Sequence, residues 1–258
     1  MVGLMGLLAS DLQAEVVDAV AWWPGDGNAN DIVGTNDGVL LNGGTYATGM
    51  VGQAFSLDGV DDRVEVPGSV SLALGSSFTI EMWIQPDSMR NAVFLEKGTG
   101  DSDNRVGFAV SANGALCGYF DSGACSASSS PADVAAGIFS HVAFVFDNDA
   151  NSARLYLNGE LVATGEETRT PTGTVASLNI GMRTYNSDQF FDGLIDEPTV
   201  YARALSTSEI LAIYDSGSTG KSGAQPAPSL SPPSIALLGA LLAGIGVFGL
   251  AGRRLPLV

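Results

Sequence analysis

Alternation of apolar and polar residues restricts the fold of this chain more than any other feature. Residues 78–85 read Phe-Thr-Ile-Glu-Met-Trp-Ile-Gln, with Phe78, Ile80, Met82 and Ile84 at every second position. Successive side chains of a strand point to opposite faces of a sheet, so this period of two predicts a β-strand with one face in the core. Residues 141–146, apolar after His141, predict a second, more fully buried strand.

Asn-Gly pairs separate further apolar segments. Asn158-Gly159 lies between residues 154–157 and 161–163, and it supplies the positive φ angles that a type I′ hairpin turn needs. Asn113-Gly114 predicts a second hairpin by the same device. Short strands at short intervals, with turn residues between them, favour an all-β fold: an antiparallel two-sheet sandwich of the jelly-roll type.

The folded domain is expected to span residues 15–216 and to end in one short helix. Ser206 is a suitable N-cap, and Glu209 completes a capping box. Residues 217–233 are rich in Ser, Gly, Pro and Ala, a composition typical of a linker. Residues 1–14 are mostly apolar and predict the remnant of a secretory signal peptide without its basic segment; an ordinary buried strand is the alternative.

Residues 234–258 form a separate C-terminal segment. Its first part, 234–252, carries no charge and is close to the ~20 apolar residues that span a bilayer. Arg253 and Arg254 follow, and basic residues remain on the cytoplasmic side, so we expect a transmembrane helix with the β domain outside. A buried core helix is the alternative.

This segment resembles the IPTL-CTERM and PEP-CTERM sorting signals of Gram-negative bacteria. The resemblance rests on Pro228 and Leu230 before the apolar stretch and on the terminal Arg253 and Arg254. It departs from the family where Ile, Thr and Trp of the short motif are replaced. It implies processing by an exosortase-type protease and a location at the cell envelope or surface, anchored in the membrane at least before processing.

Charge excludes one class of partner. The chain has 11 Lys and Arg against 28 Asp and Glu, a formal net charge of -17. Nucleic-acid binding draws its affinity from basic side chains that neutralise phosphates, so nucleic acid is not an expected partner. The acidic surface attracts divalent cations instead.

Five motifs in series resemble the laminin-G-like branch of the concanavalin A-like lectin/glucanase superfamily over residues 16–215. They are the segments 23–31, 54–62, 78–83, 139–159 and 191–210, whose family patterns include "F-DG-DD" and "FT-E-W". Phe139 stands where the family usually has Trp, and Pro198 interrupts the last motif. The resemblance implies a jelly roll, and it allows bound calcium because many such domains hold Ca²⁺.

Two groups of oxygen-bearing side chains are candidate calcium ligands. Ca²⁺ takes six to eight oxygen ligands in irregular geometry. The first set joins the opening loop to the last strand, and the second lies in one short loop; simple turn formation is the alternative for both. The first set is Asp26, Asn28, Asp31 and Asp196. The second is Asp58, Asp61 and Asp62.

Cys117 and Cys125 are the only cysteines, and they flank a predicted hairpin tip. Because we expect the chain to be exported, we predict a structural disulfide between them. For ligand contact we single out loop residues with aromatic or cationic side chains. These are Tyr119, Arg183, Tyr185 and Phe190.

No catalytic residue is assigned. Retaining glucanases of this superfamily carry Glu-x-Asp-x-x-Glu, which the sequence lacks, and His141 is a sole histidine inside an apolar strand. We therefore expect a secreted, surface-displayed binding or adhesion module, calcium-dependent or not, that recognises a glycan or an extracellular protein. A diverged glycoside hydrolase and a structural cell-surface or matrix protein remain alternatives.

Overall fold

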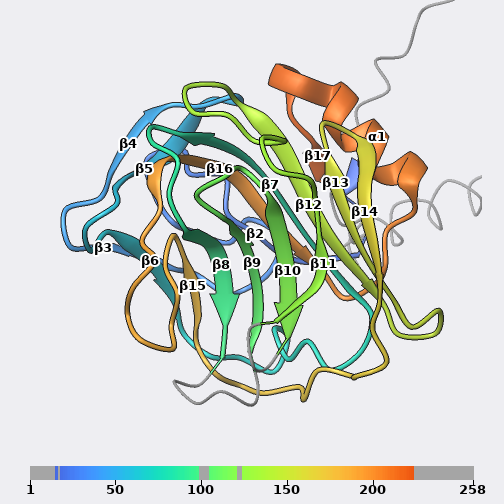
Figure 1. The fold of residues 1–258 in the computed structure, drawn as a ribbon. Coiled ribbons are helices and arrows are strands. Elements are labelled where there is room, and N and C mark those ends of the chain that lie inside the picture. Colours follow the sequence, from blue (N-terminus) through green and yellow to red (C-terminus); the bar gives the residue numbers. More distant parts are fainter. Residues whose placement is uncertain (1–14, 17, 99–104, 121–123, 224–258) are drawn as a thin grey trace, which may run out of the picture. The chain divides into compact units, whose positions relative to one another are not determined.

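The computed structural model describes residues 15–16, 18–98, 105–120 and 124–223 (Figure 1). They form two antiparallel sheets packed face to face and one short α-helix, which confirms the all-β two-sheet prediction. The expected signal-peptide remnant, 1–14, and the expected transmembrane segment, 234–258, lie outside the described residues. Within the described part, no helix has the length and apolar character needed to cross a membrane.

The seven-stranded sheet has the order β11-β10-β9-β8-β15-β6-β3. Its strands are β3 (Val39–Leu41), β6 (Arg63–Val66), β8 (Ala92–Lys97), β9 (Val106–Val110), β10 (Leu116–Phe120), β11 (Cys125–Ser128) and β15 (Leu178–Ile180). Strands β8 to β11 follow one another as hairpins, while β15 inserts between β8 and β6. Residues far apart in the sequence thus become neighbours on this sheet.

The eight-stranded sheet has the order β14-β13-β12-β7-β16-β5-β4, and β2 also pairs with β16. Its strands are β2 (Ala19–Trp22), β4 (Thr45–Thr48), β5 (Gln53–Asp58), β7 (Phe78–Pro86), β12 (Ser140–Asp147), β13 (Ser152–Leu157), β14 (Glu160–Glu166) and β16 (Asp192–Tyr201). Strands β7 and β16 lie at its centre, between two cores that cover the two faces of the sheet. Nearly all residues of both strands are therefore buried.

Aromatic rings fill the space between the sheets. Phe78 lies 5.7 Å from Phe120 and 5.4 Å from Phe144 between ring centroids, both in edge-on orientation. The alternate residues predicted to face inward from β7 are all in this core. Edge-on aromatic pairs add about 0.5–1.5 kcal/mol beyond the area they bury, so this cluster fixes the spacing of the sheets.

A second, smaller core lies on the outer face of the eight-stranded sheet. Helix α1 (Thr207–Ser216) covers it, beside β13 and β14 (Figure 1). Ser206 and Glu209 form the predicted capping box, and Ile210 and Ile213 are buried against the sheet. The helix thereby shields the face of β7 that carries Glu81.

Both predicted Asn-Gly hairpins form, with different turns. Asn158 and Gly159 have φ of 50° and 79°, as a type I′ turn requires. The β9–β10 hairpin has a positive φ at Gly114 and not at Asn113, so the predicted type I′ turn is wrong there. The backbone N–H of Gly114 instead closes a turn onto Ser111.

The folded domain continues past the expected end at 216. A short 3₁₀ turn, η1 (Gly217–Thr219), leads into β17 (Ser222–Gly223), which pairs in parallel with β1 (Glu15–Val16). Lys221, between η1 and β17, is 8% exposed. The linker-like composition of 217–233 gives no sign of this extension. The extension is held to the domain by one lysine, Lys221, whose partners lie on β7 and β16.

Candidate functional site

A pocket of about 320 Å³ lies on the outer face of the seven-stranded sheet. It is bounded by β9, β10, β11 and the loop between β15 and β16. Its lining residues are Asn91, Arg105, Ala109, Val110, Ser111, Cys117, Tyr119, Cys125, Arg183, Tyr185 and Gln189. Three of the four predicted ligand residues, Tyr119, Arg183 and Tyr185, are among them; Phe190 is not.

Tyr119 lies across β9 because its register partner there is Gly107. A Cβ atom at position 107 would lie 2.1 Å from the Tyr119 ring, so this place in the strand accepts only glycine without rearrangement. The Tyr119 hydroxyl donates a hydrogen bond to Glu96. Burial, and then the charge of Glu96, raises the pKa of Tyr119, so the phenol remains a donor at neutral pH.

Glu96 is fully buried beneath the pocket and joins its parts. Besides Tyr119, its carboxylate accepts the backbone N–H of Thr184 at 2.8 Å and that of Tyr185 at 3.3 Å. Arg105 Nη1 lies 3.5 Å from Glu96 Oε2. A buried carboxylate is stable only with such partners, so Glu96 positions both Arg105 and the loop that carries Tyr185.

Arg105 and Tyr185 form a stacked pair. The Arg105 guanidinium lies 4.8 Å from the centroid of the Tyr185 ring. Tyr185 is 41% exposed whereas Arg105 is 4% exposed. The ring is thus held from one side and leaves apolar surface for a ligand.

The loop that carries Tyr185 is closed by an ion pair. Arg183 donates from Nε and Nη2 to the two carboxylate oxygens of Asp188, at 2.6 Å each, and their backbones form an isolated bridge. The hydrogen bonds that Arg183 donates to Asp188 raise the pKa of Arg183. The bidentate contact fixes the plane of the guanidinium, so Arg183 enters the pocket wall with a defined orientation.

The predicted disulfide between Cys117 and Cys125 is present and lines the same pocket, with a Cα–Cα distance of 5.3 Å. The two residues are not directly opposite, because Cys125 pairs with Tyr119 across a register shift. The bond therefore fixes β11 against the strand that carries Tyr119.

Sequence reasoning missed Asn91, Arg105, Ser111 and Gln189, which come from four separate segments. None stands in a motif, and only the order of β8, β9 and β15 in the sheet brings them together. Among the lining residues there is no Asp or Glu. The polar groups offered to a ligand are thus guanidinium, amide and hydroxyl.

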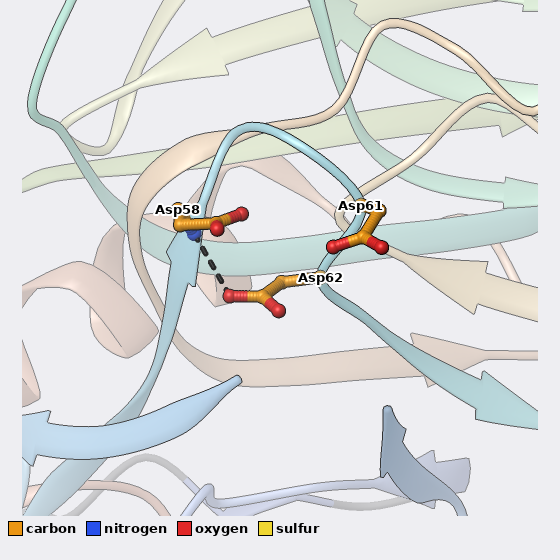
Figure 2. A group of neighbouring side chains, drawn as sticks. All are labelled: Asp58, Asp61 and Asp62. Atoms are coloured by element: carbon orange, nitrogen blue, oxygen red, sulfur yellow. Dashed lines mark hydrogen bonds between the residues drawn. The ribbon is translucent and has the colours of Figure 1, made fainter. Parts of the chain in front are cut away.

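A separate carboxylate cluster lies between β5 and β6. Asp58, Asp61 and Asp62 each place one oxygen within 4.8 Å of the others (Figure 2). Asp62 Oδ2 accepts the N–H of Asp58 at 3.1 Å, while Asp62 Oδ1 is buried without a hydrogen-bond partner. Burial, together with the charges of Asp58 and Asp61, raises the pKa of Asp62. A bound cation would satisfy the lone oxygen and offset this repulsion.

The other predicted calcium ligands are arranged differently. Asp31 accepts five hydrogen bonds, from the N–H groups of four residues and an amide, and so organises the loop from Trp22 to Asn36. Asn28 bonds within its own loop. In the described part of the chain, the second set is the one group of three or more acidic, His or Cys side chains close enough to share an ion.

Asp26 and Asp196 both accept hydrogen bonds from the backbone of residues 51–53. Asp26 Oδ1 accepts the N–H of Gln53 at 2.8 Å, and Asp196 Oδ2 accepts that of Val51 at 2.8 Å. Asp196 Oδ1 is buried and without a partner, and burial raises the pKa of Asp196 to about 7. Calcium binding by the first set stays a prediction, with Asp26 and Asp196 as its best-placed members.

The profile described as "Concanavalin A-like lectin/glucanases superfamily" matches residues 58–211. No curated protein matches the chain. Among solved structures, domain 4 of AbnA, a GH43 extracellular arabinanase from Geobacillus stearothermophilus in complex with arabinotriose, is 22% identical with a TM-score of 0.60. That match covers 75% of this chain and 97% of the arabinanase domain.

Two further similar structures belong to longer chains. The binding domain of botulinum neurotoxin DC in complex with SialylT is 12% identical with a TM-score of 0.53, covering 78% of this chain and 52% of the other. Trypanosoma rangeli sialidase in complex with sialic acid is 14% identical with a TM-score of 0.59, covering 76% and 32%. At these identities the likeness establishes a shared fold.

Proposed function

We propose, because this chain belongs to the concanavalin A-like lectin/glucanase superfamily, that it is a glycan-binding module whose ligand enters the pocket around Tyr119, Arg105 and Tyr185. The observation that carries the proposal is the exposed Tyr185 ring, held in place by Arg105 and the buried Glu96. A rigid ring beside fixed polar donors suits a sugar, which has an apolar face and a rim of hydroxyls.

The pocket chemistry favours binding over hydrolysis. Retaining glycosidases need two carboxyl groups about 5–5.5 Å apart, and inverting ones about 6.5–9.5 Å apart. The lining has neither Asp nor Glu. The carboxylate of Glu96 beneath it already accepts hydrogen bonds from the Tyr119 hydroxyl and from two backbone N–H groups. The carbohydrate complexes of the arabinanase domain and the toxin domain support the same choice by analogy of fold.

We further propose that the module works outside the cell, at a Gram-negative envelope or surface, anchored by residues 234–258 and processed there by an exosortase-type protease. The disulfide supports an oxidising compartment, because such bonds are rare in the cytosol. The apolar C-terminal composition supports the anchor.

Calcium is proposed as a structural ion rather than as part of the sugar contact. Asp58, Asp61 and Asp62 supply carboxylate oxygens, and the buried Asp62 Oδ1 lacks any other partner. Melting temperature measured with Ca²⁺ and with a chelator tests this. We expect a rise with Ca²⁺ that Asp62→Asn abolishes, since saturation at 100 times Kd adds about 2.7 kcal/mol. An unchanged melting curve would remove the ion from the proposal.

A glycan array with the full-length chain in a sugar-free detergent tests the main proposal. Binding of at least one glycan class is expected, without release of products. Tyr185→Ala should weaken binding about tenfold or more, as for an anchoring aromatic. Leu161→Ala is the matched control, because Leu161 is 48% exposed and lies on the other sheet. Silence on every glycan would favour a structural cell-surface protein instead.

A further inference from the structure

A second pocket, of about 380 Å³, lies at helix α1 on the opposite sheet. Its lining residues are Met50, Trp83, Phe139, Asn158, Tyr214, Asp215 and Gly217. None of them lines the pocket assigned to the glycan. Three of the seven are aromatic and one is a carboxylate; Lys and Arg do not contribute to this lining. That composition differs sharply from the first pocket, which has two arginines and no carboxylate.

The aromatic walls are held in place from behind. The ring centroids of Trp83 and Tyr214 lie 5.7 Å apart, with an angle of 34° between the ring planes. The ring centroid of the buried His141 lies 5.3 Å from that of Trp83. Tyr214 also packs on the Asn158-Gly159 turn, where a Cβ on Gly159 would lie 3.1 Å from its Cδ1 atom. The rings therefore need little reordering when a ligand binds, which lowers the entropic cost of binding.

The charges around the pocket favour a cation. Asp215 is exposed at its rim, and the chain carries a formal net charge of -17. The amide oxygen of Asn158 already accepts the N–H of His141 at 2.9 Å, which leaves the carboxylate as the dominant polar group. Aromatic faces attract cations through the ring quadrupole, and desolvation strengthens that attraction.

We propose that this pocket binds an organic ammonium group, quaternary or primary, against the aromatic lining of Trp83, Tyr214 and Phe139, with Asp215 as its counter-charge. The inference is independent of the glycan site, because the two pockets share no residue and lie on different sheets. It gives the module a second recognition surface for cationic headgroups or side chains.

The test is calorimetric titration of the full-length chain with choline and, separately, with its neutral isostere 3,3-dimethylbutan-1-ol. Choline is expected to bind with a millimolar constant and the neutral compound at least tenfold more weakly. Asp215→Asn and Tyr214→Leu should each weaken choline about two- to fivefold. The Asp149→Asn control also removes one exposed acidic charge, and it should leave choline binding unchanged.

Equal binding of both compounds would show an ordinary apolar pocket and overturn the inference. So would no heat from choline up to about 100 mM, a hundred times the expected constant. A choline affinity that Asp215→Asn leaves unchanged would place the cation elsewhere, with the same consequence. Asp215 is exposed, so its variant is expected to fold even if Tyr214→Leu does not.

Discussion

Lys221 neutralises a buried acidic cluster, and its replacement gives the sharpest test of the structure. Its Nζ donates to Glu81 Oε1 at 2.8 Å, to the Glu197 carbonyl at 2.9 Å and to Thr199 Oγ1 at 2.7 Å. A second carboxylate oxygen, Glu197 Oε2, lies 3.6 Å away. The side chains of Lys221 and Glu81 are 3% and 0% exposed, so water cannot replace a lost partner.

Lys221→Met should reduce the free energy of unfolding by about 3–5 kcal/mol, the usual cost of leaving one member of a buried ion pair alone. That is a large share of the roughly 5–15 kcal/mol of a whole domain. Urea unfolding measures it as a lower midpoint with an unchanged slope. Truncation after Ser216 should cause at least as large a loss, whereas a chain ending at Gly223 should retain full stability.

The pH dependence of the variant tests the cause. Burial alone raises the pKa of Glu81, but Lys221 and His141 outweigh it and hold this pKa below its usual value. In the wild type the stabilisation from Glu81 is present above its unfolded pKa and is lost as pH falls. Without Lys221 the carboxyl is more stable protonated, so the deficit of the variant should shrink from pH 7.5 to pH 4.5.

Adding Glu81→Gln to Lys221→Met should restore part of the lost stability, because the uncompensated charge is then removed. The reasoning about Lys221 would be refuted if the free energy of unfolding of Lys221→Met lay within about 1 kcal/mol of that of the wild type. A loss of stability that does not change with pH would refute it too.

Three further outcomes follow from the described residues. Burial raises the pKa of Glu167, but hydrogen bonds from Arg169 outweigh it and bring it to about 2; Glu167→Gln should therefore remove about 1–2 kcal/mol of stability at neutral pH and flatten its loss between pH 4 and pH 2 in urea titrations. Burial lowers the pKa of Lys97 to about 8, so stability should rise between pH 8 and pH 10, and Lys97→Met should abolish that rise. Gly107→Ala should cost about 1–3 kcal/mol and weaken glycan binding, because the new methyl group displaces the Tyr119 ring; an unchanged midpoint and affinity would contradict this.

Local sequence was a reliable guide wherever the structural cause is itself local. The period-two pattern of β7, the type I′ turn at Asn158-Gly159 and the capping box at Ser206 depend on neighbours within a few residues. The disulfide was also predictable, because the two cysteines flank a short predicted hairpin tip and export was expected. The Asn113-Gly114 turn failed because an Asn-Gly pair permits a type I′ turn but does not impose one.

The candidate sites were only partly predictable. Tyr119, Arg183 and Tyr185 were singled out as loop-like aromatic or cationic residues, but Arg105 and Glu96, which hold them, were not. The pocket forms where β8, β9, β10 and the loop after β15 meet, and sheet order brings these segments together. Pattern within one segment carries no information about such pairing.

The sequence by itself determined that this chain forms an antiparallel β-sandwich, because alternating hydrophobicity and turn residues dictate which face of each strand leaves water. Only the tertiary structure decided that Lys221 belongs to the domain, that Glu96 supports the pocket around Tyr119 and that Trp83 and Tyr214 share a second pocket. Buried charges and shared pockets depend on residues up to 175 positions apart, as in the hydrogen bond from Trp22 to Glu197. Their energies exist only once the sheets have closed around them.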